Sequence, residues 1–161
     1  MKTMSLKKIA LFLCFLFSMI TVCAGDVLNY EIEGAGVGTQ GTYLVKVWVV
    51  SKKNKPNLNL IKKCAVHGVL FRGFVNENKR GGKKPLAGSA VVEQEHKSYF
   101  KDFFEDEGAY RNYVTMVSDV YEVVKTKKKE YRIGATLSVY SEQLRKQLTA
   151  DGIIRGLNTG F

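Results

Sequence analysis

The stretch that decides the fold is Thr42-Tyr43-Leu44-Val45-Lys46-Val47-Trp48-Val49-Val50-Ser51. Its odd-numbered side chains from 43 to 49 are a tyrosine and three valines, and its even-numbered side chains include Leu44, Trp48 and Val50. Alternation with a period of two predicts a β-strand. Because both faces of the strand are mostly apolar, we expect it to occupy a central position in a sheet.

Three more strands and three helices are predicted around this stretch. The strands cover 27–33, 119–125 and 131–140, and glycines in 34–41 form the turn of the first hairpin. The helices cover 57–72, 94–117 with an interruption near Gly108, and the residues that follow Ser141 as N-cap. Residues 73–88, rich in glycine and lysine, are expected to be a flexible segment. Hairpin connections favour an α+β fold of order ββα–α–ββα: an antiparallel sheet of about four strands, with two or three helices packed mainly on one face.

The first 24 residues have the three parts of a secretory signal peptide. Lys2, Lys7 and Lys8 precede an uncharged apolar run at 9–22, and small residues precede a cleavage site before Gly25. The run of 14 residues is shorter than the roughly 20 that a membrane-spanning helix needs, so a retained anchor is the lesser alternative. Lipidation at Cys23 is a second alternative, but Val22 is a poor residue to precede a lipid-bearing cysteine. We therefore expect a signal peptide at 1–24, a single domain at 25–161, no transmembrane segment after processing, and a periplasmic or secreted protein.

Cleavage would leave Cys64 as the only cysteine, which excludes an internal disulfide. Cys64 and His67 lie one turn apart on the predicted helix, a spacing compatible with a catalytic pair or half of a zinc site. Cys64 falls on the predicted core face, where a free cysteine behaves as a small apolar residue. We therefore predict a structural role for Cys64, with no catalytic residue, metal or cofactor assigned.

A G-x-G-x-x-G pattern spans 36–41. In dinucleotide-binding folds this loop opens a helix, whose N-terminus holds the pyrophosphate. Here the loop opens a strand, so we interpret the glycines as components of a twisted hairpin turn. The carboxylates between Glu93 and Glu107 could hold a cation or form an acid–base pair, but the pattern is that of a solvated helix face.

Positive charge is concentrated in the predicted loops. Loss of the three signal lysines lowers the formal net charge from +10 to +7. A basic surface of this kind favours anionic partners such as lipid headgroups or polymers, although a solvated soluble surface is the simpler interpretation. Nucleic acid is a less favoured partner because the clusters contain no interleaved aromatic residues. The candidate anion-binding residues are Lys52, Lys53, Lys55, Lys79, Arg80, Lys83, Lys84, Lys127, Lys128 and Lys129.

The segments 41–49, Ala65-Val66-His67-Gly68-Val69 and 156–161 resemble small exported proteins of unknown function from Gram-negative bacteria. A second resemblance is to the N-terminal domain of a flagellar outer-membrane ring-assembly protein. There too a strand leads to an alanine-bearing helix, and a later hairpin leads to a helix beginning near Leu144. The second resemblance implies an envelope assembly or interaction module, and neither resemblance assigns a site residue.

Taken with predicted export and the lack of a catalytic motif, these features favour a non-enzymatic envelope module that binds or scaffolds another envelope protein. The first alternative is a basic module that binds an anionic envelope polymer or lipid. The second alternative is an enzyme of unrecognised type, which a deep pocket holding Cys64 or His67 together with an acid would favour.

Overall fold

The structure is a computed structural model that describes residues 28–78, 81–126 and 128–156. The predicted signal peptide and its cleavage site lie outside the described residues, as do Lys79, Arg80 and Lys127. No helix in the described ranges combines the length and the apolar character that crossing a bilayer requires.

The predicted central strand lies at the centre of the sheet. It is β2 (Tyr43–Ser51), and it pairs antiparallel with β1 (Tyr30–Gly34) on one side and with β7 (Tyr131–Val139) on the other. The β2–β7 ladder runs over all nine residues of both strands, from Tyr43 opposite Val139 to Ser51 opposite Tyr131. The pairing places the end of β2 beside the start of β7.

Four short strands complete the sheet in the described part of the chain. They are β3 (Phe74–Asn76), β4 (Gly82–Lys83), β5 (Val114–Met116) and β6 (Glu122–Lys125). The order across the sheet is β4-β3-β1-β2-β7-β5, and β6 also pairs with β7. Since β2 occupies one edge of β7 along its whole length, β5 and β6 share the other edge, β5 near the C-terminal end of β7 and β6 near its N-terminal end.

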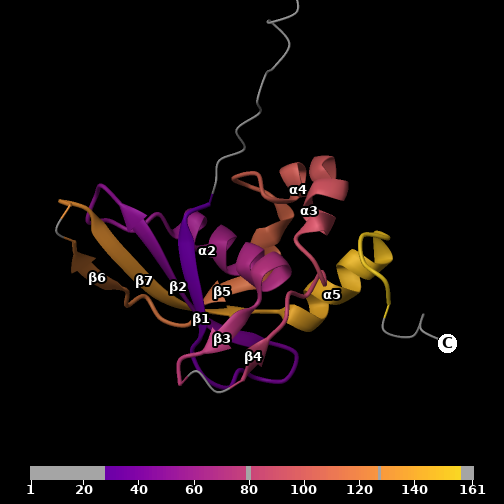
Figure 1. The fold of residues 1–161 in the computed structure, drawn as a ribbon, viewed down its shortest axis with the longest axis horizontal. Coiled ribbons are helices and arrows are strands. Elements are labelled where there is room, and N and C mark those ends of the chain that lie inside the picture. The colour runs from indigo at the N-terminus through magenta and orange to yellow at the C-terminus, as the bar shows by residue number, and fades with distance from the viewer. Residues whose placement is uncertain (1–27, 79–80, 127, 157–161) are drawn as a thin grey trace, which may run out of the picture.

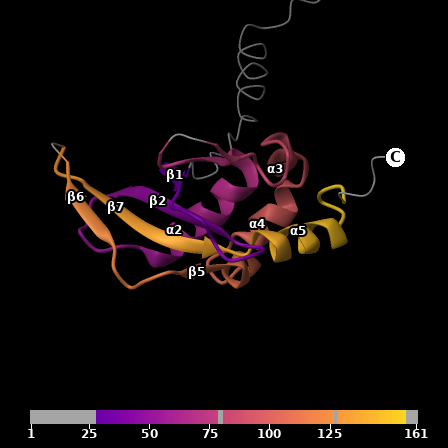
Figure 2. The ribbon, with the colours of Figure 1, turned by 90° about the horizontal axis from the view of Figure 1, so that it is seen from below.

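The helical elements cover one face of the sheet and extend beyond its end. They are α2 (Leu58–His67), the π-helical η1 (Gly68–Arg72), α3 (Val91–Glu95), α4 (Lys97–Phe103), the 3-10 helix η2 (Ala109–Tyr113) and α5 (Ser141–Ala150). Helix α2 packs against β2, β5 and β7. Figures 1 and 2 show α3, α4 and α5 grouped at one end of the molecule, with the β6–β7 hairpin at the other.

The core lies between α2 and the odd-numbered side chains of β2 and β7. Val45 and Val47 of β2 and Leu137 of β7 are fully buried, as are Ile61 and Ala65 of α2. Alternating strand positions place these apolar side chains on one face, against the apolar stripe of the helix. Burial of this common face explains why the central strand and the first helix are predictable from sequence.

The opposite face of β2 carries Trp48 and charged residues. The indole Nε1–H donates to Glu33 Oε1 at 3.1 Å. Lys46 Nζ and Arg132 Cζ lie 4.8 and 4.5 Å from the centre of a Trp48 ring. Lys46 pairs in turn with Glu122 at 2.6 Å, so this face is stabilised by cation–π and ionic contacts between strands.

The α+β class is confirmed, but the sheet has more strands than the four that were expected, and not all of them are antiparallel. The sheet is mixed rather than antiparallel, because β3 runs parallel to β1. Two of the unpredicted strands, β3 and β4, come from the segment 73–88 that was predicted to be flexible. Gly73 at φ +68° brings the chain back beside the sheet, where β3 pairs with β1.

The predicted helix at 94–117 is also partly wrong. It divides into α4, η2 and strand β5, because Val114 and Met116 pair with β7 instead of continuing a helix. The N-cap of α5 is Tyr140, while Ser141 is its first residue. The Ser141 hydroxyl donates to the Gly41 carbonyl at 3.1 Å, so this side chain joins the first hairpin to α5 rather than capping the helix.

Candidate functional site

The structure brings two of the predicted lysine clusters to the same end of the sheet. Lys52, Lys53 and Lys55 follow β2, and Lys128 and Lys129 precede β7, while Ser51 and Tyr131 pair directly across the ladder. Among the described residues, six exposed lysines at this end, which include Lys125 at the end of β6, form what we call the basic end: Lys52, Lys53, Lys55, Lys125, Lys128 and Lys129.

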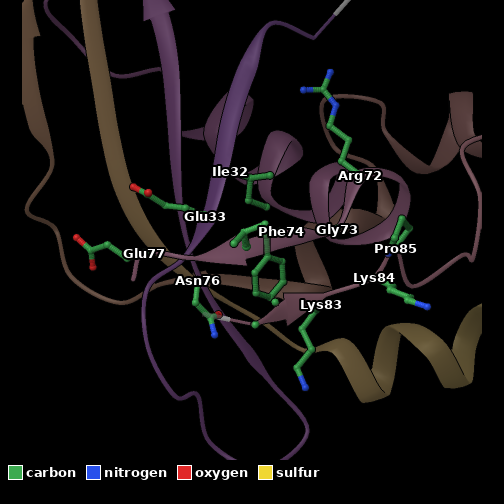
Figure 3. Close-up of a pocket in the computed structure, with 13 residues that line it drawn as sticks. Ile32, Glu33, Arg72, Gly73, Phe74, Asn76, Glu77, Lys83, Lys84 and Pro85 are labelled. Atoms are coloured by element: carbon green, nitrogen blue, oxygen red, sulfur yellow. The ribbon is translucent and has the colours of Figure 1, made fainter. Parts of the chain in front are cut away.

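Lys83 and Lys84 lie at a different place, on the far edge of the sheet. Lys83 is in β4, and both residues line an open cavity of about 680 Å³ together with Arg72, Glu33 and Glu77. In Figure 3 the side chains of Arg72, Lys83 and Lys84 point away from one another. The cavity therefore does not present convergent positive charges, and carboxylates share its lining.

The guanidinium of Arg72 is engaged in hydrogen bonds within the protein. Its two terminal nitrogens donate to the carbonyl oxygens of Tyr30 and Leu28, at 3.0 and 3.1 Å. Its guanidinium carbon lies 4.0 Å from the centre of the Tyr30 ring. Arg72 thus anchors the beginning of β1 to η1, and the basic end is the stronger candidate for recognition of an anionic group.

Strand β6, beside the basic end, is an exposed edge. In the described part of the chain it pairs only with β7, and all four of its residues are exposed. Val123 and Val124 retain 41% and 52% of their accessible surface, and Val120, just before the strand, retains 75%. Exposed edges with apolar side chains are uncommon in soluble proteins because they pair readily with other chains.

A second candidate site surrounds His67. Its Nδ1 lies 2.6 Å from the Tyr30 hydroxyl, and its Nε2 lies 3.1 Å from Glu93 Oε1. An ionised carboxylate only accepts hydrogen bonds, so Nε2 donates to Glu93 and neutral His67 accepts from Tyr30 at Nδ1. The imidazole adjoins a cavity of about 320 Å³ whose rim includes Lys63, Lys97 and Lys101.

This cavity holds a histidine together with an acid, the arrangement that would favour an enzyme. Burial lowers the pKa of His67, although the neighbouring Glu93 carboxylate opposes the shift. Burial also raises the pKa of the Tyr30 hydroxyl, so Tyr30 stays protonated at neutral pH. Both imidazole nitrogens are already bonded to protein groups, which leaves neither of them directed at a ligand. The arrangement therefore serves to join β1, α2 and α3, and its geometry does not favour a catalytic role for His67.

Cys64 is a core residue, as predicted. Its side chain is 1% exposed, and burial raises the pKa of its thiol to about 12. At neutral pH this thiol is protonated and inaccessible, which disfavours both nucleophilic attack and metal binding. Among the described residues, no group of three or more His, Cys, Asp or Glu side chains could hold a metal ion.

The glycine-rich loop has a mechanical role in the structure. Gly36 and Gly41 adopt φ values of +125° and +78°, in the region that favours glycine. The Gly41 carbonyl accepts from the backbone N–H of Glu142 at 3.0 Å, in addition to the Ser141 hydroxyl. The loop therefore connects the β1–β2 hairpin to the first turn of α5, in line with the interpretation of its glycines as turn residues.

Sequence reasoning identified the lysine clusters but missed the exposed edge. The relevant signal was available in Val120-Tyr121-Glu122-Val123-Val124, where apolar residues occupy both faces of a predicted strand. A run of this kind is also typical of a buried strand, so the sequence alone does not distinguish an exposed edge from a buried strand.

The chain was compared with known proteins, and it matches no family model, no curated protein and no solved structure.

Proposed function

We propose that this protein is a non-enzymatic binding module of the cell envelope, which recognises another envelope protein by accepting an extended segment at β6. The observation that carries the proposal is the exposure of β6. It is a strand with apolar side chains on both faces, an open outer edge in the described part of the chain, and lysines beside it. Addition of a strand to such an edge is a common mode of peptide recognition.

The hydrogen-bond pattern identifies the backbone groups that would receive the partner. The Thr126 N–H donates to the Glu130 carbonyl at the hairpin turn. Antiparallel ladders alternate between residues that bond to the paired strand and residues that face away from it. Counting back from Thr126, the backbone N–H and C=O of Val123 and Lys125 face away from β7.

The charge around the edge favours an acidic partner. Lys125, Lys128 and Lys129 lie at the turn end of the β6–β7 hairpin, and Lys52 and Lys53 lie at the neighbouring end of β2. Complementary charge speeds association and restricts the choice of partner, while the apolar strand residues supply the contact area. We therefore expect an extended partner segment that combines β-branched or aromatic residues with carboxylates.

Substitution of Val123 tests this proposal. Val123→Pro removes an N–H that faces away from β7, so the substitution should block strand addition while keeping the β6–β7 ladder. Val123→Thr is the matched control because it keeps the N–H and the branched shape of the side chain. Each variant would replace the wild type in its native envelope, followed by cross-linking and capture.

The expected result is a partner that is captured by the wild type and by Val123→Thr but lost with Val123→Pro. Circular dichroism of both variants would confirm that the fold is kept. A partner that all three proteins capture equally would exclude the β6 edge as its binding site. Absence of any reproducible partner would contradict the proposed function.

The basic end supports a second candidate, binding of an anionic envelope polymer or lipid. The supporting observation is the convergence of two lysine clusters that are more than 70 residues apart in the sequence. Binding of this kind should weaken steeply between low and physiological ionic strength, because exposed charges are screened by salt. It should also be lost in a Lys128→Gln/Lys129→Gln variant and kept in Val123→Pro, the reverse of the pattern expected for strand addition.

A further inference from the structure

A pocket of about 450 Å³ is lined by residues of α4, of η2 and of the C-terminal part of α5 with its cap. Figure 1 shows α4 and α5 at the end of the molecule opposite the β6–β7 hairpin. Its lining combines aromatic rings with carboxylates and one amide. None of the lining residues is a lysine or an arginine, although the chain has a formal net charge of +10. The lining residues are Tyr99, Asp102, Phe103, Ala109, Tyr113, Gln147 and Asp151.

The three aromatic rings of the lining form a continuous stack. Tyr99 and Phe103 lie with ring centres 5.9 Å apart and an interplanar angle of 15°. Phe103 and Tyr113 follow at 6.0 Å and 23°. Phe103 is almost fully buried, which holds the stack in place against the core. The faces of such rings carry partial negative charge and attract cations.

The two carboxylates occupy different environments. Asp151 accepts from the Tyr99 hydroxyl at 2.6 Å and from Gln147 Nε2 at 2.9 Å. These hydrogen bonds lower the pKa of the Asp151 carboxyl, so it is ionised and fixed in orientation at neutral pH. No hydrogen bond or ion pair of the Asp102 carboxylate is found with another described side chain. Its oxygens are therefore available to a ligand that enters the pocket.

We propose that this pocket binds an organic cation, a guanidinium or ammonium group that stacks on the aromatic rings and donates to Asp102 and Asp151. The volume accommodates the end of an arginine or lysine side chain, or a small free amine. A planar guanidinium fits the combination best, since it stacks on rings and donates to carboxylates at the same time. The inference does not depend on the β6 edge, because the pocket shares no residue with that edge.

Methylguanidinium is the probe for the first test, with methyl glucoside as a neutral comparator that could also stack on aromatic rings. Binding would be followed through the amide chemical shifts of the pocket residues in two-dimensional NMR. We expect saturable shifts with methylguanidinium and none with the sugar. Asp102→Asn should weaken binding about tenfold, the loss expected when a charged acceptor becomes neutral.

The matched control is Asp119→Asn, which removes the same charge from an exposed position in the bend between β5 and β6. It should leave the affinity for methylguanidinium within twofold of the wild type. Equal weakening by both substitutions would reduce the effect to general electrostatics and overturn the proposal. Lack of saturation, or tighter binding of the sugar, would overturn it as well.

A second arm distinguishes the two sources of a guanidinium group. Acetyl-Gly-Arg-Gly-amide presents the group as part of a peptide, whereas methylguanidinium presents it alone. Peptide binding at least tenfold tighter assigns the pocket to a protein side chain, and equal binding assigns it to a small free cation. In both cases Asp102→Asn must weaken binding, and the proposal is wrong if it does not.

Discussion

Replacement of Gly134 by alanine should destabilise the protein through the single tryptophan. Gly134 lies opposite Trp48 in the β2–β7 ladder, and a Cβ at this position would lie 2.6 Å from two carbons of the indole ring. The Cβ is fixed to the backbone and the ring carbons belong to a rigid indole, so the indole must tilt away from the sheet. The backbone of Gly134 is not in the left-handed region, and the three atoms nearest to the added Cβ all belong to the indole ring, so the ring contact is the obstacle that the substitution must overcome.

The size of the effect follows from the contacts of the ring. Tilting removes the hydrogen bond from Trp48 to the Glu33 carboxylate, which is worth about 1.5 kcal/mol at the low end for a charged acceptor. It also weakens the contacts with Lys46 and Arg132, which are worth about 0.5–1 kcal/mol each at exposed sites. The entropy that alanine removes from the unfolded chain offsets about 0.4–1 kcal/mol. With the two ring contacts about half lost, the expected net loss in the free energy of unfolding is about 1–2 kcal/mol.

Urea unfolding measures this loss, and Trp48 provides a direct signal because it is the only tryptophan of the chain. The emission maximum of folded Gly134→Ala should shift to longer wavelength as the ring becomes more exposed. In a Trp48→Leu background, followed by circular dichroism, the same Gly134→Ala substitution should be neutral or stabilising. Equal stability and unchanged emission of Gly134→Ala would refute the argument, as would the same destabilisation in both backgrounds.

Three further predictions concern titration, reactivity and processing. Because burial lowers the pKa of His67 in the folded protein, the unfolded chain takes up a proton first, and stability should fall as the pH drops from about 7 to 5.5. Urea unfolding at a series of pH values should therefore show a flatter slope for His67→Gln, and equal slopes would contradict this assignment. In a chain that starts at Gly25, the Cys64 thiol should resist an aromatic disulfide reagent at pH 8 and react on unfolding in urea; rapid labelling of the folded chain would contradict its burial. Mass spectrometry of the protein from envelope fractions should find an N-terminus at Gly25, and an intact Met1 there would contradict cleavage.

The long strands were predictable because their side chains alternate over nine residues. In β2 and β7 the odd-numbered side chains face the core, and the even-numbered side chains lie on the opposite face, which carries Trp48 and its charged neighbours. The alternation in the sequence therefore matches the two faces of the sheet. The strands β3 and β4 have only three and two residues, too few positions to establish a period. Strand β5 was predicted as helix because Tyr113, Met116 and Val117 have helical spacing. Pairing with β7 overrides that local preference.

The candidate sites were less predictable than the fold because each depends on contacts between distant segments. The lysines after β2 and those before β7 were recognised as separate clusters, but nothing in the local sequence places β2 beside β7. Likewise, Asp102 and Asp151 belong to α4 and to the end of α5, and their proximity depends on how η2 lies between the two helices. The sequence therefore identified the types of residue that form the sites, whereas only the tertiary structure shows which distant residues lie close together.

The position of β7 makes the two proposed sites separable. Its N-terminal half carries β6 with the exposed edge, and its C-terminal end leads into α5, whose last turn precedes Asp151. The ladder with β2 supports β7 along all nine of its residues, which lie between the two sites. A ligand at one site alters the other only if the protein has two conformations that the ligand binds with different affinity. We expect the supported strand to keep one conformation, so occupancy of one site should not alter the affinity of the other. Val123→Pro should therefore bind methylguanidinium as tightly as the wild type, and Asp102→Asn should keep the partner at β6. A change in either affinity would mean that the two sites are coupled through the sheet, and it would contradict the independence of the two sites.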